Sequence, residues 1–146
     1  MANKTAYIAS SFRKKERRDN VVRIKNILSE MGVSCYVPME HKIEGAWSLT
    51  NKEWAKRVMA SDLDAIDRSD FVLFVCYNDE GGQQGSAFEC GYAYSKGKPI
   101  VAVMMNEAPI GLMLGSSFRA MINGIDEIAK YDFDALPSAD PIREQR

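Results

Sequence analysis

The sequence predicts a single α/β domain of the doubly wound kind, with a mostly parallel central sheet of about five strands. Short apolar runs alternate along the chain with segments of helical periodicity, which is the order that βαβ units require. The run at 71–76 (FVLFVC) is apolar throughout, as expected of a strand that helices cover on both faces. A length of 146 residues suits one such domain.

The individual elements follow from local patterns. Apolar runs predict strands at 5–9, 33–37, 71–76, 100–104 and, less regularly, near 118–122. Helical spacing predicts helices over about 13–31, over about 51–68, and from about 86 to a stop at Gly97 and Pro99. The first helix has apolar residues at i, i+3, i+4 and i+7, which are Ile24, Ile27, Leu28 and Met31. The segments 39–48 and 78–85 are predicted loops. Together these elements predict a flavodoxin- or Rossmann-like arrangement.

Composition limits the classes of function. The net charge of −1 gives no reason to expect nucleic acid or a membrane as a partner. Three cysteines, odd in number and far apart (Cys35, Cys76 and Cys90), suit a reducing cytoplasm. With no leader-like start and no apolar run near 18 residues, we expect a cytoplasmic protein. The domain is expected to span 1–136, followed by a polar tail at 137–146.

In a doubly wound sheet, ligands bind beyond the carboxyl ends of the strands. Three segments that follow predicted strands should converge there, namely Ser10–Ser11, 78–85 and 105–113. This edge of the sheet is therefore the expected ligand site.

Asp62 interrupts an apolar stripe on the second predicted helix. By its spacing the stripe faces the core, and it comprises Ala55, Val58, Met59, Asp62, Leu63 and Ile66. A carboxylate in such a stripe is costly unless it is paired or opens onto a cavity. Asp62 therefore either reaches water or an arginine at the edge of the stripe, or faces a binding cavity.

Glu89 also has two interpretations. The segment 86–89 (SAFE) has the S-x-x-E pattern of a capping box, in which Ser86 caps the third helix and Glu89 supports it. Glu89 also lies at the expected ligand edge, where a carboxylate is well placed to act on a bound sugar.

Two carboxylates and a tyrosine at one edge suit chemistry at an anomeric carbon. The transition state there resembles an oxocarbenium ion, which one carboxylate can stabilise and trap, while a second acid moves a proton. A metal site is not expected, because the sequence has a single histidine, His41. His41 lies in a predicted loop, and the sequence assigns it no role.

Several motifs resemble the nucleoside 2-deoxyribosyltransferase superfamily, which includes 2′-deoxynucleoside 5′-monophosphate N-glycosidases. They lie at 7–12 (YIASSF), 61–63 (SDL), 69–72 (SDFV), 85–93 (GSAFECGYA) and 97–99 (GKP). The resemblance covers roughly residues 5 to 115, and its most specific part is the block around Glu89.

The resemblance implies three residues at the catalytic centre. Glu89 would be the nucleophile that attacks C1′ and forms a glycosyl-enzyme intermediate. Tyr7 would hydrogen-bond that carboxylate, and Asp62 would assist proton transfer to the leaving base. No organic cofactor and no metal is implied.

The resemblance further implies substrate-binding residues and a homodimer or higher homo-oligomer whose neighbouring subunit completes the pocket. The substrates would be a nucleoside or nucleoside monophosphate and a free nucleobase. The substrate-binding residues would be Ser10, Ser11, Phe12, Arg13, Gln83, Gly85, Ser86, Gly111 and Met113. Two of these depart from the transferase pattern. Gln83 stands where transferases carry an aspartate that contacts the base, and Gly111 where they carry an asparagine.

Three functions stay open at this stage. The block around Glu89 favours a 2′-deoxyribosyltransferase, in which an acceptor base resolves the intermediate. The turn Ser11-Phe12-Arg13 resembles the Ser-Ile-Arg turn of the monophosphate hydrolases and would suit a phosphate. A non-catalytic nucleotide-binding domain on the same fold is the third, although it would not need Tyr7, Asp62 and Glu89 together.

Overall fold

The computed structural model describes residues 3–77, 83–107 and 109–139. The strands form one sheet in the order β2-β1-β3-β4-β5, and every neighbouring pair is parallel. Their bounds are β1 Lys4–Ala9, β2 Val33–Tyr36, β3 Phe71–Cys76, β4 Ile100–Met104 and β5 Ala120–Asn123. The predicted doubly wound α/β class is confirmed, and the order is the flavodoxin-like one.

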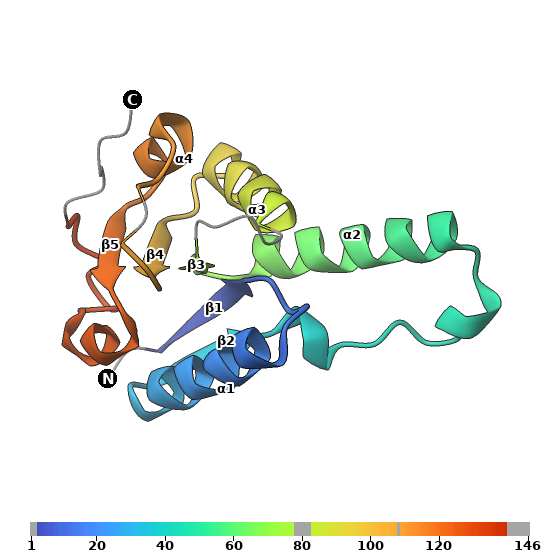
Figure 1. Cartoon of the computed structure of the whole chain (residues 1–146), viewed down its shortest axis with the longest axis horizontal. Helices are drawn as coiled ribbons and strands as arrows, with labels where there is room; N and C mark the ends of the chain where they lie inside the picture. The colour runs from blue at the N-terminus through green and yellow to red at the C-terminus, as the bar shows by residue number, and fades with distance from the viewer. Residues whose placement is uncertain (1–2, 78–82, 108, 140–146) are drawn as a thin grey trace.

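Helices connect the strands (Figure 1). The α-helices are α1 Lys15–Glu30, α2 Asn51–Arg68, α3 Gln84–Ser95 and α4 Leu112–Ser116. Short 3-10 helices lie at η1 Pro38–Glu40, η2 Ala46–Ser48 and η3 Ile125–Lys130. The sequence predicted neither these 3-10 helices nor α4. Residues 78–82 of the predicted glycine-rich loop and 140–146 of the predicted tail lie outside the described residues.

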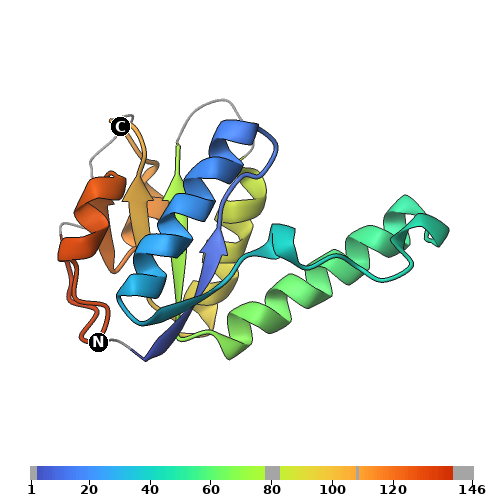
Figure 2. The same cartoon turned by 90° about the horizontal axis from the view of Figure 1, so that it is seen from below.

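The sheet separates two apolar cores, because side chains alternate between its faces. On β1, Ala6 and Ile8 pack in one core with α1 and η3, whereas Tyr7 and Ala9 pack in the other with α2 and α3. All six residues of β3 are buried, as a strand covered on both faces requires. Figures 1 and 2 show the helices on the two sides of the sheet.

The strand order places a switch point between β1 and β3. From β1 the chain crosses through α1 to β2 on one side, while β3 leads through α3 to β4 on the other. Because these crossovers cover opposite faces, a crevice opens beyond the carboxyl ends of β1 and β3.

Helix α2 is not a core helix over its whole length, so the predicted core-facing stripe is wrong for its first half. A capping box between Thr50 and Glu53 starts the helix. Only Ala65 and Ile66 near its end are buried, whereas Met59 is 47% exposed. The reason is geometric, since the start of α2 and the segment before it project beyond the sheet (Figure 2).

The predicted capping box at Ser86 is also wrong. Helix α3 begins at Gln84, with Gln83 as its N-cap residue. Ser86 is therefore inside the first turn and buried, where it has the wrong backbone conformation for a cap. Glu89 consequently makes no capping box with Ser86, and its side chain is available for another partner.

The chain after β5 packs on the first core through η3 and Phe133. Ala139, in the segment predicted as a tail, forms a parallel bridge to Ala120 of β5. No helix in the described part of the chain is both long and apolar enough to cross a membrane.

Candidate active site

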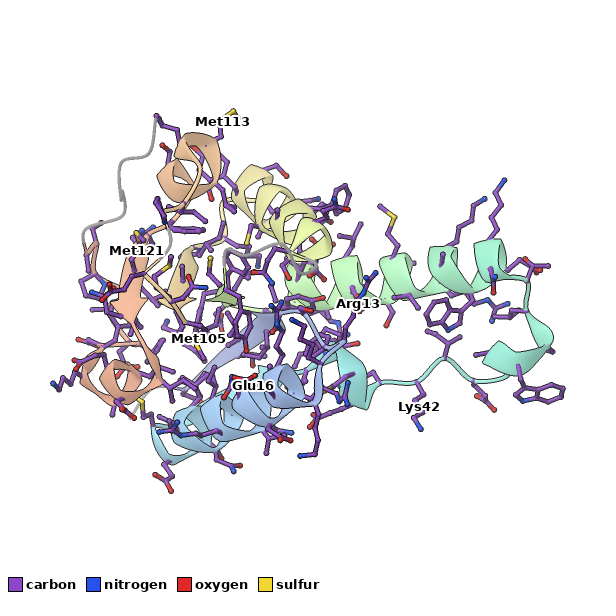
Figure 3. The ribbon with its side chains drawn as sticks, in the orientation of Figure 1. Arg13, Glu16, Lys42, Met105, Met113 and Met121 are labelled. Atoms are coloured by element: carbon purple, nitrogen blue, oxygen red, sulfur yellow. The ribbon has the colours of Figure 1, made fainter. Side chains whose placement is uncertain are left out.

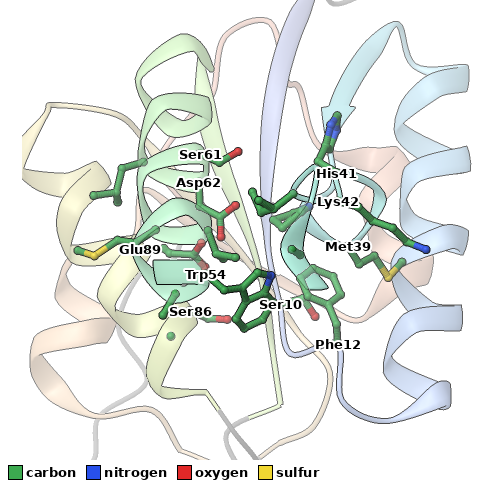
Figure 4. Close-up of a pocket in the computed structure, with 18 of the residues that line it drawn as sticks. Ser10, Phe12, Met39, His41, Lys42, Trp54, Ser61, Asp62, Ser86 and Glu89 are labelled. Atoms are coloured by element: carbon green, nitrogen blue, oxygen red, sulfur yellow. The ribbon is translucent and has the colours of Figure 1, made fainter. Parts of the chain in front are cut away.

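A cavity of about 1020 Å³ opens at the switch point. Its walls are the turn after β1, the segment from η1 to η2, one side of α2 and the start of α3. Eight of the sequence-predicted site residues line it, namely Ser10, Ser11, Phe12, Arg13, Asp62, Gly85, Ser86 and Glu89. Figure 4 shows Asp62 and Glu89 on one wall and Phe12 and Met39 on the other.

Tyr7 and Glu89 form the centre of the site. Tyr7 lies in β1 with its side chain fully buried, and its hydroxyl donates a hydrogen bond to the Glu89 carboxylate on α3. Burial, reinforced by the negative charge of Glu89, holds the pKa of the Tyr7 hydroxyl far above its ordinary value. Tyr7 therefore remains a proton donor to Glu89 at every physiological pH.

Burial raises the pKa of the Glu89 carboxyl to about 7. The hydrogen bond from Tyr7 opposes this effect, and the charge of Asp62 adds to it. A carboxylate with little solvation and a single strong donor is a reactive nucleophile. A pKa near the working pH is also what a group at a catalytic centre commonly has.

Asp62 faces the cavity from α2, so of its two interpretations the structure supports the cavity-facing one. Burial raises the pKa of its carboxyl, while interactions with the Tyr7 hydroxyl and with His41 oppose the rise. The Tyr7 hydroxyl thus interacts with both carboxylates. A carboxyl whose pKa is raised is suited to holding a proton and giving it to a leaving group.

The turn after β1 brings polar groups to the same cavity. Ser10 donates from its hydroxyl to the backbone carbonyl of Ser11, at 3.1 Å. The Ser11 Oγ is buried, and within the described residues it has no hydrogen-bond partner. Since buried hydroxyls are normally paired, this one is free for a bound ligand. Arg13 lines the cavity nearby.

Besides the buried Tyr7, three predicted site residues do not line this cavity. Gln83 turns its side-chain oxygen to the backbone N–H of Tyr77, at 3.3 Å. Gly111 is the N-cap of α4, and Met113 on that helix is 89% exposed. Figure 3 shows Met113 at the outer side of α4. It lines a separate apolar hollow with Tyr94 and Leu112, between α3 and α4.

Sequence reasoning missed several cavity residues. His41, Lys42, Trp54 and Phe88 all line the cavity, although the sequence gives no role to His41. Trp47 and Trp54, which are 92% and 46% exposed, make the outer wall apolar. The available signal was a pair of tryptophans beside an irregular segment. Within the described chain, no group of three or more His, Cys, Asp or Glu side chains is placed to hold a metal ion.

Comparisons with known proteins agree with this geometry. The sequence model of the family described as nucleoside 2-deoxyribosyltransferase matches residues 6–125. A nucleoside deoxyribosyltransferase of Lactobacillus johnsonii is 31% identical over 68% of this chain and 71% of its own length. One of Lactobacillus leichmannii is 34% identical over 53% of this chain and 55% of its own length.

The structure of this chain is also similar to solved structures. A 2-deoxyribosyltransferase of Bacillus psychrosaccharolyticus superposes with a TM-score of 0.82 at 26% identity, covering 92% of this chain and 97% of that one. A CMP N-glycosidase of Clostridium botulinum superposes with a TM-score of 0.58 at 16% identity, over 87% and 96% of the two chains. The second likeness is one of fold.

Proposed function

Because this chain belongs to the nucleoside 2-deoxyribosyltransferase family, we propose that it moves a 2-deoxyribosyl group from one nucleobase to another through a covalent intermediate on Glu89. The observation that carries the proposal is the hydrogen bond from Tyr7 to Glu89 at a cavity that Asp62 also faces. The nucleophile and the acid therefore face one space, and the nucleophile has a buried orienting donor.

The first half-reaction breaks the bond between C1′ and the base. A Glu89 carboxylate oxygen attacks C1′, and the electron pair of the C1′–N bond leaves with the base nitrogen. That nitrogen takes its proton from Asp62, which faces the same cavity and whose pKa is raised by burial. The product is a glycosyl ester of Glu89 and a free base.

The second half-reaction reverses the first with a different base. A ring nitrogen of the acceptor attacks C1′, and the bond between C1′ and Glu89 breaks so that its electron pair returns to the carboxylate. The proton on the acceptor nitrogen passes to Asp62. Tyr7 donates to Glu89 before and after the ester exists, so it orients the carboxylate for both steps.

The experiment is chromatography of bases and nucleosides after incubation with a 2′-deoxynucleoside, with and without a second base. We expect a new nucleoside only when the acceptor base is present, and no exchange with Glu89→Ala. Exchange that survives Glu89→Ala would contradict the mechanism. Tight nucleotide binding without any turnover would instead favour a non-catalytic binding domain.

The second candidate is hydrolysis of nucleoside 5′-monophosphates, and the buried, unpaired Ser11 Oγ favours it. With Arg13 on the same wall, that hydroxyl suits a phosphate oxygen. Water would then replace the acceptor base. Release of base from monophosphates alone, whether or not an acceptor is present, and its loss in Ser11→Ala would support this candidate over the transferase.

We further propose a homodimer or higher homo-oligomer in which the Gly111–Met113 segment reaches a neighbouring subunit's cavity. The exposure of Leu112 and Met113 supports this, because adjacent exposed apolar side chains commonly mark interfaces. Mixing Glu89→Ala with Met113→Asp tests it. If each subunit completes its neighbour's site, mixed assemblies regain activity that neither variant has alone. Additive activities would contradict the shared site.

We propose the cytoplasm as the protein's compartment. Cys35, Cys76 and Cys90 are all free thiols, which supports a reducing environment.

A further inference from the structure

Three aromatic rings form a column that ends at the catalytic centre. The Tyr7 ring stacks on Tyr36 with centroids 5.7 Å apart and planes at 14°. Tyr36 in turn stacks on His41, at 4.1 Å and 6°. Strand pairing explains the first contact, because Tyr7 of β1 and Tyr36 of β2 are register partners on adjacent parallel strands. Side chains at such positions share one face of the sheet.

Tyr36 also reaches the helix that carries Asp62. Its hydroxyl lies 3.3 Å from the Ser61 Oγ, within hydrogen-bond distance. Ser61 immediately precedes Asp62 on α2, on the part of that helix where burial is incomplete. Tyr36 therefore contacts Tyr7 through its ring and the backbone neighbour of Asp62 through its hydroxyl.

Tyr36 packs at the margin of the second core. Strand β2 is the edge of the sheet, and Tyr36 is only partly buried. Its ring stacks on the buried Tyr7 and on His41, which is exposed and follows η1. The only histidine of the chain thus closes the column from the solvent side while it also lines the active-site cavity.

We propose that Tyr36, held in place by His41, is a positioning residue that fixes the Tyr7 hydroxyl on Glu89 and the Asp62 carboxyl in the same cavity. This inference rests on the proposed transferase or hydrolase function of the site. Neither Tyr36 nor His41 needs to touch the sugar or the base in this role. Their effect is on the rate of bond breaking, because misplacing a reacting group by about 1 Å can lower a rate about 10²-fold.

Four variants separate the contacts. Tyr36→Leu removes the ring and should lower kcat about 10²-fold with a much smaller change in KM. Tyr36→Phe keeps the stack, loses the contact with Ser61, and should lower kcat by up to about tenfold. His41→Ala removes the outer ring and should lower kcat about two- to tenfold. His41→Phe restores a stacking ring but not the charge interaction of His41 with Asp62, and should restore most of kcat.

Glu44→Ala is the matched control for His41→Ala. Glu44 is exposed in the same segment and should leave kcat and KM unchanged. The His41 variants alter an exposed side chain, so the test stands even if Tyr36→Leu fails to fold. Unchanged kcat in both His41 variants, or equal losses in His41→Ala and His41→Phe, would overturn the proposal.

An NMR measurement tests the stacking of the three rings independently of the reaction. As the only histidine, His41 gives one set of ring-proton NMR signals, and stacking on Tyr36 should shift them upfield. Tyr36→Leu should remove that shift, whereas Glu89→Ala should preserve it. A shifted signal in a wild-type protein that turns over no substrate would refute the proposed function and leave the column standing. A signal that Tyr36→Leu does not move would refute the column.

Discussion

Replacing Glu89 by glutamine is expected to stabilise the folded protein at alkaline pH while it removes turnover. Burial raises the pKa of the Glu89 carboxyl from 4.5 to about 7, so the fold favours the protonated side chain over the charged one. Glutamine has nearly the same shape, carries no charge, and still offers an oxygen to the Tyr7 hydroxyl. It therefore resembles the form of Glu89 that the fold prefers.

The sign and size follow from linkage. Between pH 4.5 and 7 the folded protein keeps a proton on Glu89 that the unfolded chain has released, so the free energy of unfolding falls as pH rises. At 1.36 kcal/mol per pH unit, the full loss is about 3 kcal/mol. It is absent below pH 4.5 and complete above pH 7. For a chain of this size, that corresponds to about 6–12 °C in Tm.

The assay is thermal unfolding of the wild type and Glu89→Gln, followed by circular dichroism at pH 4.5 and at pH 8.5. We expect nearly equal Tm values at pH 4.5 and a higher Tm for the variant at pH 8.5. Glu44→Gln makes the same change of charge at an exposed position and should show no such pH-dependent gain. A gain of equal size at both pH values, or none at pH 8.5, would refute the burial argument.

Three further outcomes are expected in steady-state assays. The value of kcat/KM should rise with pH through about 7, as Glu89 loses its proton; a profile that is flat from pH 5.5 to 8.5 would contradict this. Asp62→Asn should slow the release of poorly leaving bases more than that of good leaving bases, and equal slowing would argue against proton donation. Tyr7→Phe should lower kcat by about 10- to 100-fold through loss of a hydrogen bond to a charged group, whereas a loss confined to KM would assign Tyr7 to binding.

The sheet could be predicted because its signals are local. Strand β3 is apolar at every position and buried on both faces, and the alternation of strand and helix required a parallel sheet. Helix boundaries were harder to predict from the sequence. The S-x-x-E pattern at Ser86 matched a capping box, yet α3 starts earlier, at Gln84, without a side-chain cap.

The stripe on α2 shows a second limit. Periodicity reveals which face of a helix is apolar, but not whether that face meets a core or a cavity. Met59 and Val58 have the spacing of core residues, and both line the active-site cavity. Asp62 lies on the same face. The sequence allowed it either to reach water or an arginine or to face a binding cavity, and only the position of the cavity decides between the two.

Long-range contacts were beyond sequence reasoning for a physical reason. Tyr7 and Tyr36 stack because two strands pair in one register, and His41 joins them because the chain turns back over Tyr36 after η1. Neither arrangement leaves a periodic pattern. The proposed roles of Gly111 and Met113 require a neighbouring subunit, and within one chain neither residue lines the active-site cavity.

The most direct test of the central role of Glu89 is mass spectrometry of the protein after rapid quenching with a 2′-deoxynucleoside and no acceptor base. We predict a protein heavier by one deoxyribosyl group, with the group on the peptide that contains Glu89 and absent from Glu89→Ala. Turnover in Glu89→Ala, or a deoxyribosyl group attached to a different residue, would contradict the account.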